Sequence, residues 1–158
     1  MYYGEAVTKL DDKGRITVPS RIRETMNHEG HLSWFMARGY DRSIFLFHRD
    51  AWNLIRGQVS HYSSMDAKTL GFRRLFFSSV AEARLDPQGR MAVPQHLREY
   101  AGIDKDAVLI GVEDHLELWN RDAWRAFQES TGEGYEELAS LLFSPAGAQD
   151  AQPERARE

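Results

Sequence analysis

Two arginines stand in the same short motif at two places in the chain, and arginine in such a position could bind anions. The motif is Asp-x-x-Gly-Arg, at residues 11–15 and again at residues 86–90. A guanidinium group offers paired donors that match a phosphate group or the edge of guanine. A tight turn before each arginine would project Arg15 and Arg90 from a rigid support, so the chemistry they suggest is contact with DNA.

The same spacing has a second explanation that involves no DNA. Each arginine follows an aspartate by four residues, so Asp11 with Arg15 and Asp86 with Arg90 could form ion pairs that brace the turns. The two roles are compatible, and the residues alone favour neither.

Other basic residues near the first motif could contact phosphates, which fix register but carry no sequence information directly. Lys13, Arg21 and Arg23 are the candidates. Gln88 replaces Lys13 in the second motif, so we expect the first copy to make the stronger contacts.

No feature predicts catalysis or a metal site. His28 and His31 are three residues apart with a glycine between them, whereas the metalloprotease signature needs a spacing of four on a helix. This pattern predicts a solvated turn with no third ligand nearby. A nucleophile with a base and an orienting group is not recognisable either. We therefore expect no enzyme activity, no cofactor, no metal and no small-molecule substrate.

Composition bounds the class of protein. Cysteine is absent from the 158 residues, which excludes disulfides and zinc–thiolate sites. No apolar segment is long enough for a membrane helix and none follows a basic N-terminus, so we expect a cytoplasmic protein without a membrane partner. The net charge of −4 includes −5 from residue 129 onward. The body is therefore nearly neutral and can still carry a basic face for DNA.

An internal repeat organises the chain. Residues 10–24 (LDDKGRITVPSRIRE) match residues 85–99 (LDPQGRMAVPQHLRE) at eight of fifteen positions, with an offset of 75. The tetrapeptide Arg-Asp-Ala-Trp recurs at 49–52 and 121–124. Two matched blocks in the same order indicate a duplicated module.

Each copy is predicted to form a β-β-α-β-β-α module. Asp11 and Gly14, and likewise Asp86 and Gly89, are expected to form the turn of the first hairpin, with glycine at the positive-φ position. A proline then ends the second strand and opens a short helix. The last helix of each copy is expected to begin at an aspartate N-cap, Asp50 or Asp122.

The predicted organisation divides the chain into five segments. They are a first module (6–54), a helical connector whose aromatic side is core (55–80), a second module (81–126), a C-terminal helix (127–143) and a disordered tail (144–158).

These motifs resemble those of the MraZ family. The resemblance rests on the two Asp-x-x-Gly-Arg motifs, on Phe76-Phe77-Ser78 and on the run from Leu97 to Gly102, and it covers about residues 1–128. It implies an α+β fold of two tandem AbrB-like modules, interlocked as a swapped-hairpin double β-barrel with short flanking helices.

The resemblance also implies a function. Members of this family bind short direct repeats in promoter DNA as ring-shaped homo-oligomers and repress the division and cell-wall gene cluster, which places them at the nucleoid. Carried over to this sequence, the DNA contacts would centre on Arg15 and Arg90. The alternative is a structural or protein-binding ring without DNA specificity.

Overall fold

The computed structural model describes residues 1–62 and 66–143, and the chain forms two compact units that divide between Arg121 and Asp122. The tail predicted to be disordered, 144–158, lies outside the described residues. The strands are β1 (Glu5–Lys9), β2 (Arg15–Thr17), β3 (Trp34–Arg38), β4 (Ile44–His48), β5 (Ala81–Ala83), β6 (Arg90–Ala92), β7 (Asp106–Gly111) and β8 (Leu116–Asn120). The helices are α1 (Ser20–His28), α2 (Arg49–His61), α3 (Ala67–Ser79), α4 (Gln95–Ala101), α5 (Arg121–Gly132) and α6 (Tyr135–Phe143).

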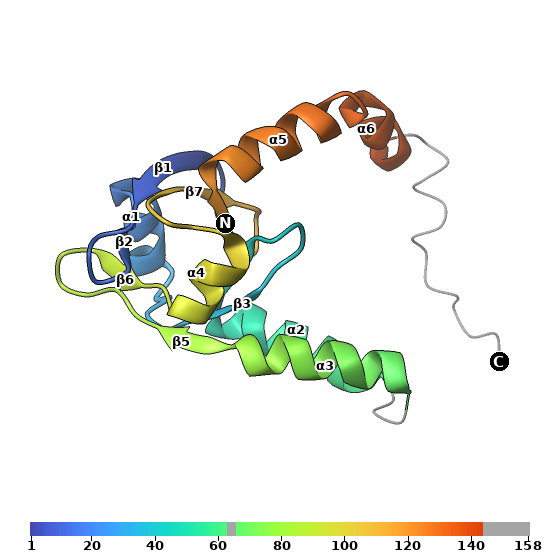
Figure 1. The fold of residues 1–158 in the computed structure, drawn as a ribbon, viewed down its shortest axis with the longest axis horizontal. Helices are drawn as coiled ribbons and strands as arrows, with labels where there is room; N and C mark the ends of the chain where they lie inside the picture. The colour runs from blue at the N-terminus through green and yellow to red at the C-terminus, as the bar shows by residue number, and fades with distance from the viewer. Residues whose placement is uncertain (63–65, 144–158) are drawn as a thin grey trace. The chain divides into compact units, whose positions relative to one another are not determined.

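The strands of the first unit form two antiparallel sheets, and both contain strands from each copy of the repeat. The larger sheet has the order β1-β7-β8-β4-β3-β5, and the smaller sheet pairs β2 with β6 (Figure 1). The first strand of each copy therefore pairs with the other copy: Val7 lies opposite Val108, and Ala83 lies opposite Trp34. The mixed α+β class predicted from the sequence is confirmed.

The hairpin turns and helix starts follow the sequence pattern closely. Gly14 and Gly89 have φ of 74° and 76°, the left-handed region that glycine adopts without strain. Pro19 and Pro94 cap α1 and α4, where a missing N–H costs no helical hydrogen bond. Pro19 and Pro94 thus lie two residues after the strands that carry Arg15 and Arg90, and a helix begins directly after each proline.

Both predicted aspartate caps are wrong. The helix α2 begins at Arg49, and its N-cap is His48, whose Nδ1 accepts a long hydrogen bond of 3.4 Å from the Ala51 N–H. The helix therefore begins two residues earlier than an Asp50 cap would allow, directly after β4 ends at His48. The helix α5 likewise begins at Arg121, before Asp122. Both aspartates lie in the first turn, where their negative charge interacts favourably with the positive end of the helix dipole.

Two clusters of buried side chains stabilise the first unit. The larger lies between the sheets, α1 and α4, and it includes residues of both copies that are completely buried, such as Ile16, Met91 and Leu109. The smaller contains Trp52 and Phe76 under α2 and α3. The predicted core role of the connector's aromatic residues is thus confirmed for Phe76, whereas Phe72 is 44% exposed.

No helix within residues 1–62 and 66–143 has both the length and the apolar character that crossing a bilayer requires.

Substitution of Ile16 should destabilise the protein strongly, because its side chain, in the middle of β2, is 0% exposed. We expect Ile16→Ala to lower the free energy of unfolding by about 2–5 kcal/mol in urea titration at fixed chain concentration. Val7→Ala, at a position that is 57% exposed on β1, is the matched control and should cost less than about 0.5 kcal/mol. Equal losses in the two variants would show that Ile16 is not a core residue.

Candidate nucleic-acid interface

The pairing of β2 with β6 gives this two-stranded ribbon one buried and one outward face. Ile16 lies opposite Met91, and both side chains are fully buried. Side chains alternate along a strand, and residues directly opposite each other share a face. The outward face therefore carries Arg15 and Thr17 of β2 together with Arg90 and Ala92 of β6.

The two arginines are diagonal neighbours on this outward face. Arg15 lies opposite Ala92, two residues from Arg90 along β6. Such diagonal positions are roughly 7–8 Å apart. Two guanidinium groups from different copies of the repeat are thus presented together (Figure 1 shows the two strands side by side).

An aspartate braces the turn before Arg15. Asp11 Oδ1 accepts hydrogen bonds from the backbone N–H groups of Lys13 and Arg15, both at 2.9 Å. Its Oδ2 accepts one from Arg15 Nε at 2.7 Å. The ion pair expected as a structural role is therefore present, and it involves only the Nε of the guanidinium group.

The second turn repeats this arrangement. Asp86 accepts hydrogen bonds from the backbone N–H groups of Gln88 and Arg90 at 2.9 and 2.8 Å, and from Arg90 Nε at 2.8 Å. Gln88 adds a longer contact, in which its Oε1 accepts from an Arg90 terminal amino group at 3.3 Å. The residue that replaces Lys13 thus binds the arginine beside it.

These hydrogen bonds keep both aspartates ionised. The backbone N–H of Arg15 is the largest cause that lowers the pKa of Asp11 below its ordinary value, and the backbone N–H of Arg90 does the same for Asp86. A lowered pKa means that the bracing is complete above the ordinary aspartate pKa and is lost only as the pH falls through the lowered value. The two turns therefore stay braced throughout the neutral range.

A second pair of arginines supports the turns from the opposite copy. Arg23 of α1 lies against Gly89, and Arg98 of α4 lies against Gly14, so closely that a Cβ on either glycine would collide with the guanidinium group. Arg23 and Arg98 are 75 residues apart, the offset of the repeat. Each turn thus has one guanidinium group from its own copy and one from the other.

Arg23 has an unsatisfied donor. Its Nε is the one buried side-chain nitrogen or oxygen without a hydrogen-bond partner in the described part of the chain, whereas Arg98 Nε donates to the Val93 carbonyl at 3.0 Å. A buried donor without a partner is costly unless a ligand satisfies it. The sequence pointed to Arg23 as a possible phosphate contact but did not predict that Arg23 and Arg98 pack on the turns of the opposite copy, although their shared offset was a usable signal.

The two other predicted site residues differ in their surroundings. Lys13 is exposed in the first turn, close to Arg15. Arg21 donates a hydrogen bond to the Tyr3 carbonyl at 2.8 Å, and its guanidinium group lies 4.5 Å from the centroid of the Tyr3 ring. The structure therefore brings Lys13, but not Arg21, into contact with a hairpin turn.

The expectation of a solvated turn is wrong for His31. His28 is exposed at the end of α1, but the His31 ring stacks on His48 with centroids 3.7 Å apart, and Tyr2 hydroxyl lies 2.6 Å from its Nδ1. Local spacing could not reveal this contact, because His48 comes from another strand.

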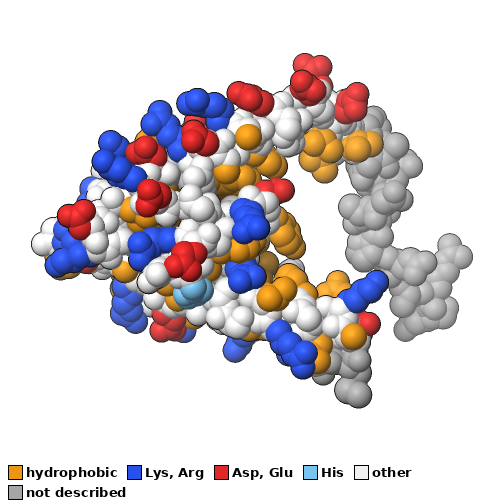
Figure 2. All heavy atoms as spheres, viewed as in Figure 1, with side chains coloured by type: hydrophobic (Ala, Val, Ile, Leu, Met, Phe, Trp, Pro, Cys, Tyr) orange, Lys and Arg blue, Asp and Glu red, His pale blue; other side chains and the backbone are white. Residues whose placement is uncertain are grey.

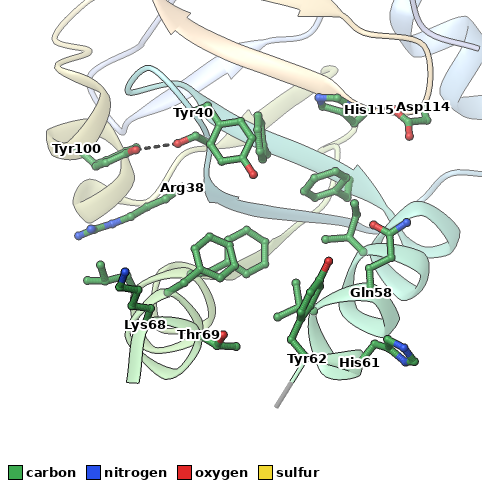
Figure 3. Close-up of a pocket in the computed structure, with 18 residues that line it drawn as sticks. Arg38, Tyr40, Gln58, His61, Tyr62, Lys68, Thr69, Tyr100, Asp114 and His115 are labelled. Atoms are coloured by element: carbon green, nitrogen blue, oxygen red, sulfur yellow. Dashed lines mark hydrogen bonds and ion pairs between the residues drawn. The ribbon is translucent and has the colours of Figure 1, made fainter. Parts of the chain in front are cut away.

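An open groove forms a second feature of the first unit. Its volume is about 1150 Å³, and its walls come from α2, α3 and the β3–β4 hairpin. Figure 3 shows Lys68 and Arg38 on one side of it and Tyr62 on the other. Its lining is mostly apolar and includes Phe45, Phe47, Val59, Tyr62, Phe72 and Leu75.

Comparison with known proteins agrees with this architecture. The family model described as "MraZ protein, putative antitoxin-like" matches residues 1–75 and again residues 76–140, so each copy of the repeat is recognised by itself.

Curated proteins named "Transcriptional regulator MraZ" are similar along most of their length. One from Syntrophomonas wolfei is 40% identical over 142 residues, covering 90% of this chain and 96% of the relative. Another from Symbiobacterium thermophilum is 37% identical, covering 88% and 98%, and one from Heliobacterium modesticaldum is 34% identical, covering 90% and 97%. With both copies of the repeat matched and about nine tenths of the chain aligned, this chain belongs to the MraZ family.

Proposed function

We propose that this protein is a sequence-specific DNA-binding regulator of transcription that binds direct repeats in promoter DNA as a ring-shaped oligomer. Its targets would include its own promoter and the division and cell-wall gene cluster, which it would repress at the nucleoid. The observation that carries the proposal is the placement of Arg15 and Arg90 on the outward face of one β ribbon.

A two-stranded ribbon has the right dimensions to read DNA. The major groove is about 12 Å wide and admits a β ribbon, and arginine pairs with the O6 and N7 atoms of guanine through two donors. Arg15 and Arg90 use Nε for their aspartates, so their terminal amino groups are the donors that would pair with guanine. One of those of Arg90 also donates to Gln88 Oε1 at 3.3 Å. Asp11 and Asp86 restrict the orientation of the two guanidinium groups, which lowers the entropy cost of binding DNA.

The surrounding basic residues suit the phosphates on either side of the groove. Lys13 is exposed in the first turn, and Arg23 has a buried Nε that lacks a partner next to the second. Arg98 supports the first turn, and Arg21 extends the basic residues along α1. Figure 2 shows Lys and Arg side chains interspersed with acidic ones. The orientation of bound DNA would therefore depend on where the basic side chains lie more than on the net charge of the protein.

The DNA-reading role predicts that charge alone cannot replace Arg15. We expect Arg15→Lys to weaken binding to a promoter fragment from upstream of the encoding gene roughly tenfold or more, because lysine keeps the charge but loses the paired donors. The melting temperature should change little, since Asp11 still accepts hydrogen bonds from two backbone N–H groups. Fluorescence anisotropy at several salt concentrations measures both specific and non-specific binding.

Arg56→Ala is the matched control, because Arg56 is an exposed arginine on α2. It should leave the specific affinity within about twofold, with only a small change in the salt dependence. A fall in melting temperature for Arg15→Lys with unchanged affinity per folded molecule would assign Arg15 a structural role only. Failure of the wild-type protein to bind any upstream DNA at low salt would favour the alternative, a protein-binding ring.

The assembly is proposed on two complementary apolar surfaces. Strand exchange between the copies supports an interlocked, swapped-hairpin double barrel within each chain, which leaves the α2–α3 groove uncovered in the first unit. In the second unit α5 and α6 bury no residue, and the apolar residues of α6 are strongly exposed: Tyr135, Leu138, Leu141, Leu142 and Phe143. In Figure 2 this segment carries acidic side chains on one side and hydrophobic ones on the other.

The two surfaces also match in charge. Lys68 and Arg38 lie at the groove, while Glu136 and Glu137 lie in the first turn of α6. Two different surfaces that bind one another make a head-to-tail contact, which closes into a ring when the rotation between neighbours permits. A ring presents many ribbons at once, so modest single contacts add up on repeated DNA sites.

Head-to-tail assembly predicts a specific mixing result. Leu142→Asp on α6 and Leu75→Asp in the groove should each abolish the ring in light scattering, because each places a charge in the apolar contact. Both side chains are exposed in the single chain, at 78% and 57%, so both variants should remain folded. A 1:1 mixture should form a dimer, since one chain keeps an intact helix and the other an intact groove.

Ser140→Asp, on the same helix, adds the same charge at a polar position and should leave the ring intact. Oligomers that survive both apolar variants would contradict the proposed contact. A mixture that stays monomeric would contradict the head-to-tail arrangement.

A further inference from the structure

A cluster of metal-ligating side chains lies outside the proposed DNA and assembly surfaces. His31 follows α1, His48 caps α2, and Asp50 lies in the first turn of α2. Each of the three offers one ligand atom, and these atoms all lie within 4.8 Å of one another. His31 is 17 positions from His48, so the fold brings it to the other two without any sequence motif.

Each imidazole has one nitrogen in contact with the protein. Tyr2 hydroxyl lies 2.6 Å from His31 Nδ1, and the Ala51 N–H donates to His48 Nδ1 at the long distance of 3.4 Å. A histidine that binds a metal ion usually donates the N–H of its other nitrogen to a protein group. His31 has this form when its Nδ1 donates to Tyr2 hydroxyl. A neutral His48 whose Nδ1 accepts carries its proton on Nε2, so it must give up the Ala51 hydrogen bond to bind an ion.

The support around His31 is rigid. Trp34 is completely buried, and its Nε1 donates to the His31 carbonyl at 3.0 Å. Tyr2 is only 2% exposed and packs edge-on against Trp34. His31 is therefore fixed in backbone and ring, whereas Asp50 is exposed and can rotate.

The electrostatic surroundings favour neutral rings. Burial is the largest cause that lowers the pKa of His31, against the opposing charges of Glu29 and Asp50. Burial also lowers the pKa of His48, followed by the effect of His31, while Asp50 and Asp114 oppose it. The N-terminal ammonium group lowers both.

We propose that His31, His48 and Asp50 bind one divalent transition-metal ion, of which Zn²⁺ is the best match. Two imidazole nitrogens and one carboxylate oxygen suit Zn²⁺, with water at the fourth position. Bonds of about 2.0–2.2 Å require the three atoms to draw together. The rings, now parallel within 4°, must turn so that both lone pairs meet, and the long His48 cap bond is the one given up.

Binding would join three separate parts of the first unit. Tyr2 lies near the N-terminus, His31 precedes β3, and His48 connects β4 to α2. An ion that binds only the folded chain raises its melting temperature by mass action. This inference does not depend on DNA binding.

Isothermal titration of the full chain with ZnCl₂ at pH 7.5, without a histidine tag, tests the proposal. We expect one Zn²⁺ per chain, and at least tenfold weaker binding in His31→Ala and in His48→Ala. Asp50→Asn should also weaken binding, and this exposed substitution leaves the fold intact. At pH 5.5 the wild-type affinity should fall at least tenfold, since protons compete for the imidazoles.

His28→Ala is the matched control, because His28 is exposed three residues from His31. It should bind Zn²⁺ like the wild type. The proposal is overturned if the wild type takes up no Zn²⁺, or if His31→Ala and Asp50→Asn bind it as tightly as the wild type. In that case the stacked rings serve packing alone.

Discussion

The arginine strands depend on backbone hydrogen bonds that cross between the two copies of the repeat. The Val18 N–H donates to the Gly89 carbonyl, and the Val93 N–H donates to the Gly14 carbonyl, both at 2.9 Å. Strands of three residues have too few hydrogen bonds to be stable in an isolated hairpin. Each turn therefore keeps its shape because the other copy holds it, and the core beneath contains side chains from both.

This mutual support explains how one arginine can serve two purposes. Arg15 stabilises its turn through Nε alone, and a guanidinium group has four further N–H donors. The ion pair with Asp11 fixes the direction of the Arg15 guanidinium group without using the terminal amino groups that would contact DNA. The structural role and the proposed DNA-contact role of Arg15, which look like alternatives in the sequence, are therefore compatible in one arrangement.

Local patterns in the sequence predicted the local structure well, because turns and caps depend on neighbouring residues. Gly14 and Gly89 have the expected positive φ, and α4 begins directly after Pro94 as predicted. The exchange of strands between copies was implied only by family resemblance, since pairing of β1 with β7 depends on residues about 100 positions apart. The contact of Arg23 with Gly89 and the stacking of His31 on His48 were not predicted either, because each also joins residues that are distant in the sequence.

The two copies are similar but not identical, and some of the differences are exposed on the outward face of the ribbon and in its turns. Thr17 and Lys13 of the first copy correspond to Ala92 and Gln88 of the second. A ribbon with exact twofold symmetry would present the same surface in both directions and would suit a palindromic site. Here the pairing is symmetric but the exposed side chains are not, so the two directions along the ribbon are not equivalent. If the ribbon binds DNA as proposed, a ring of such ribbons would suit direct repeats better than inverted ones.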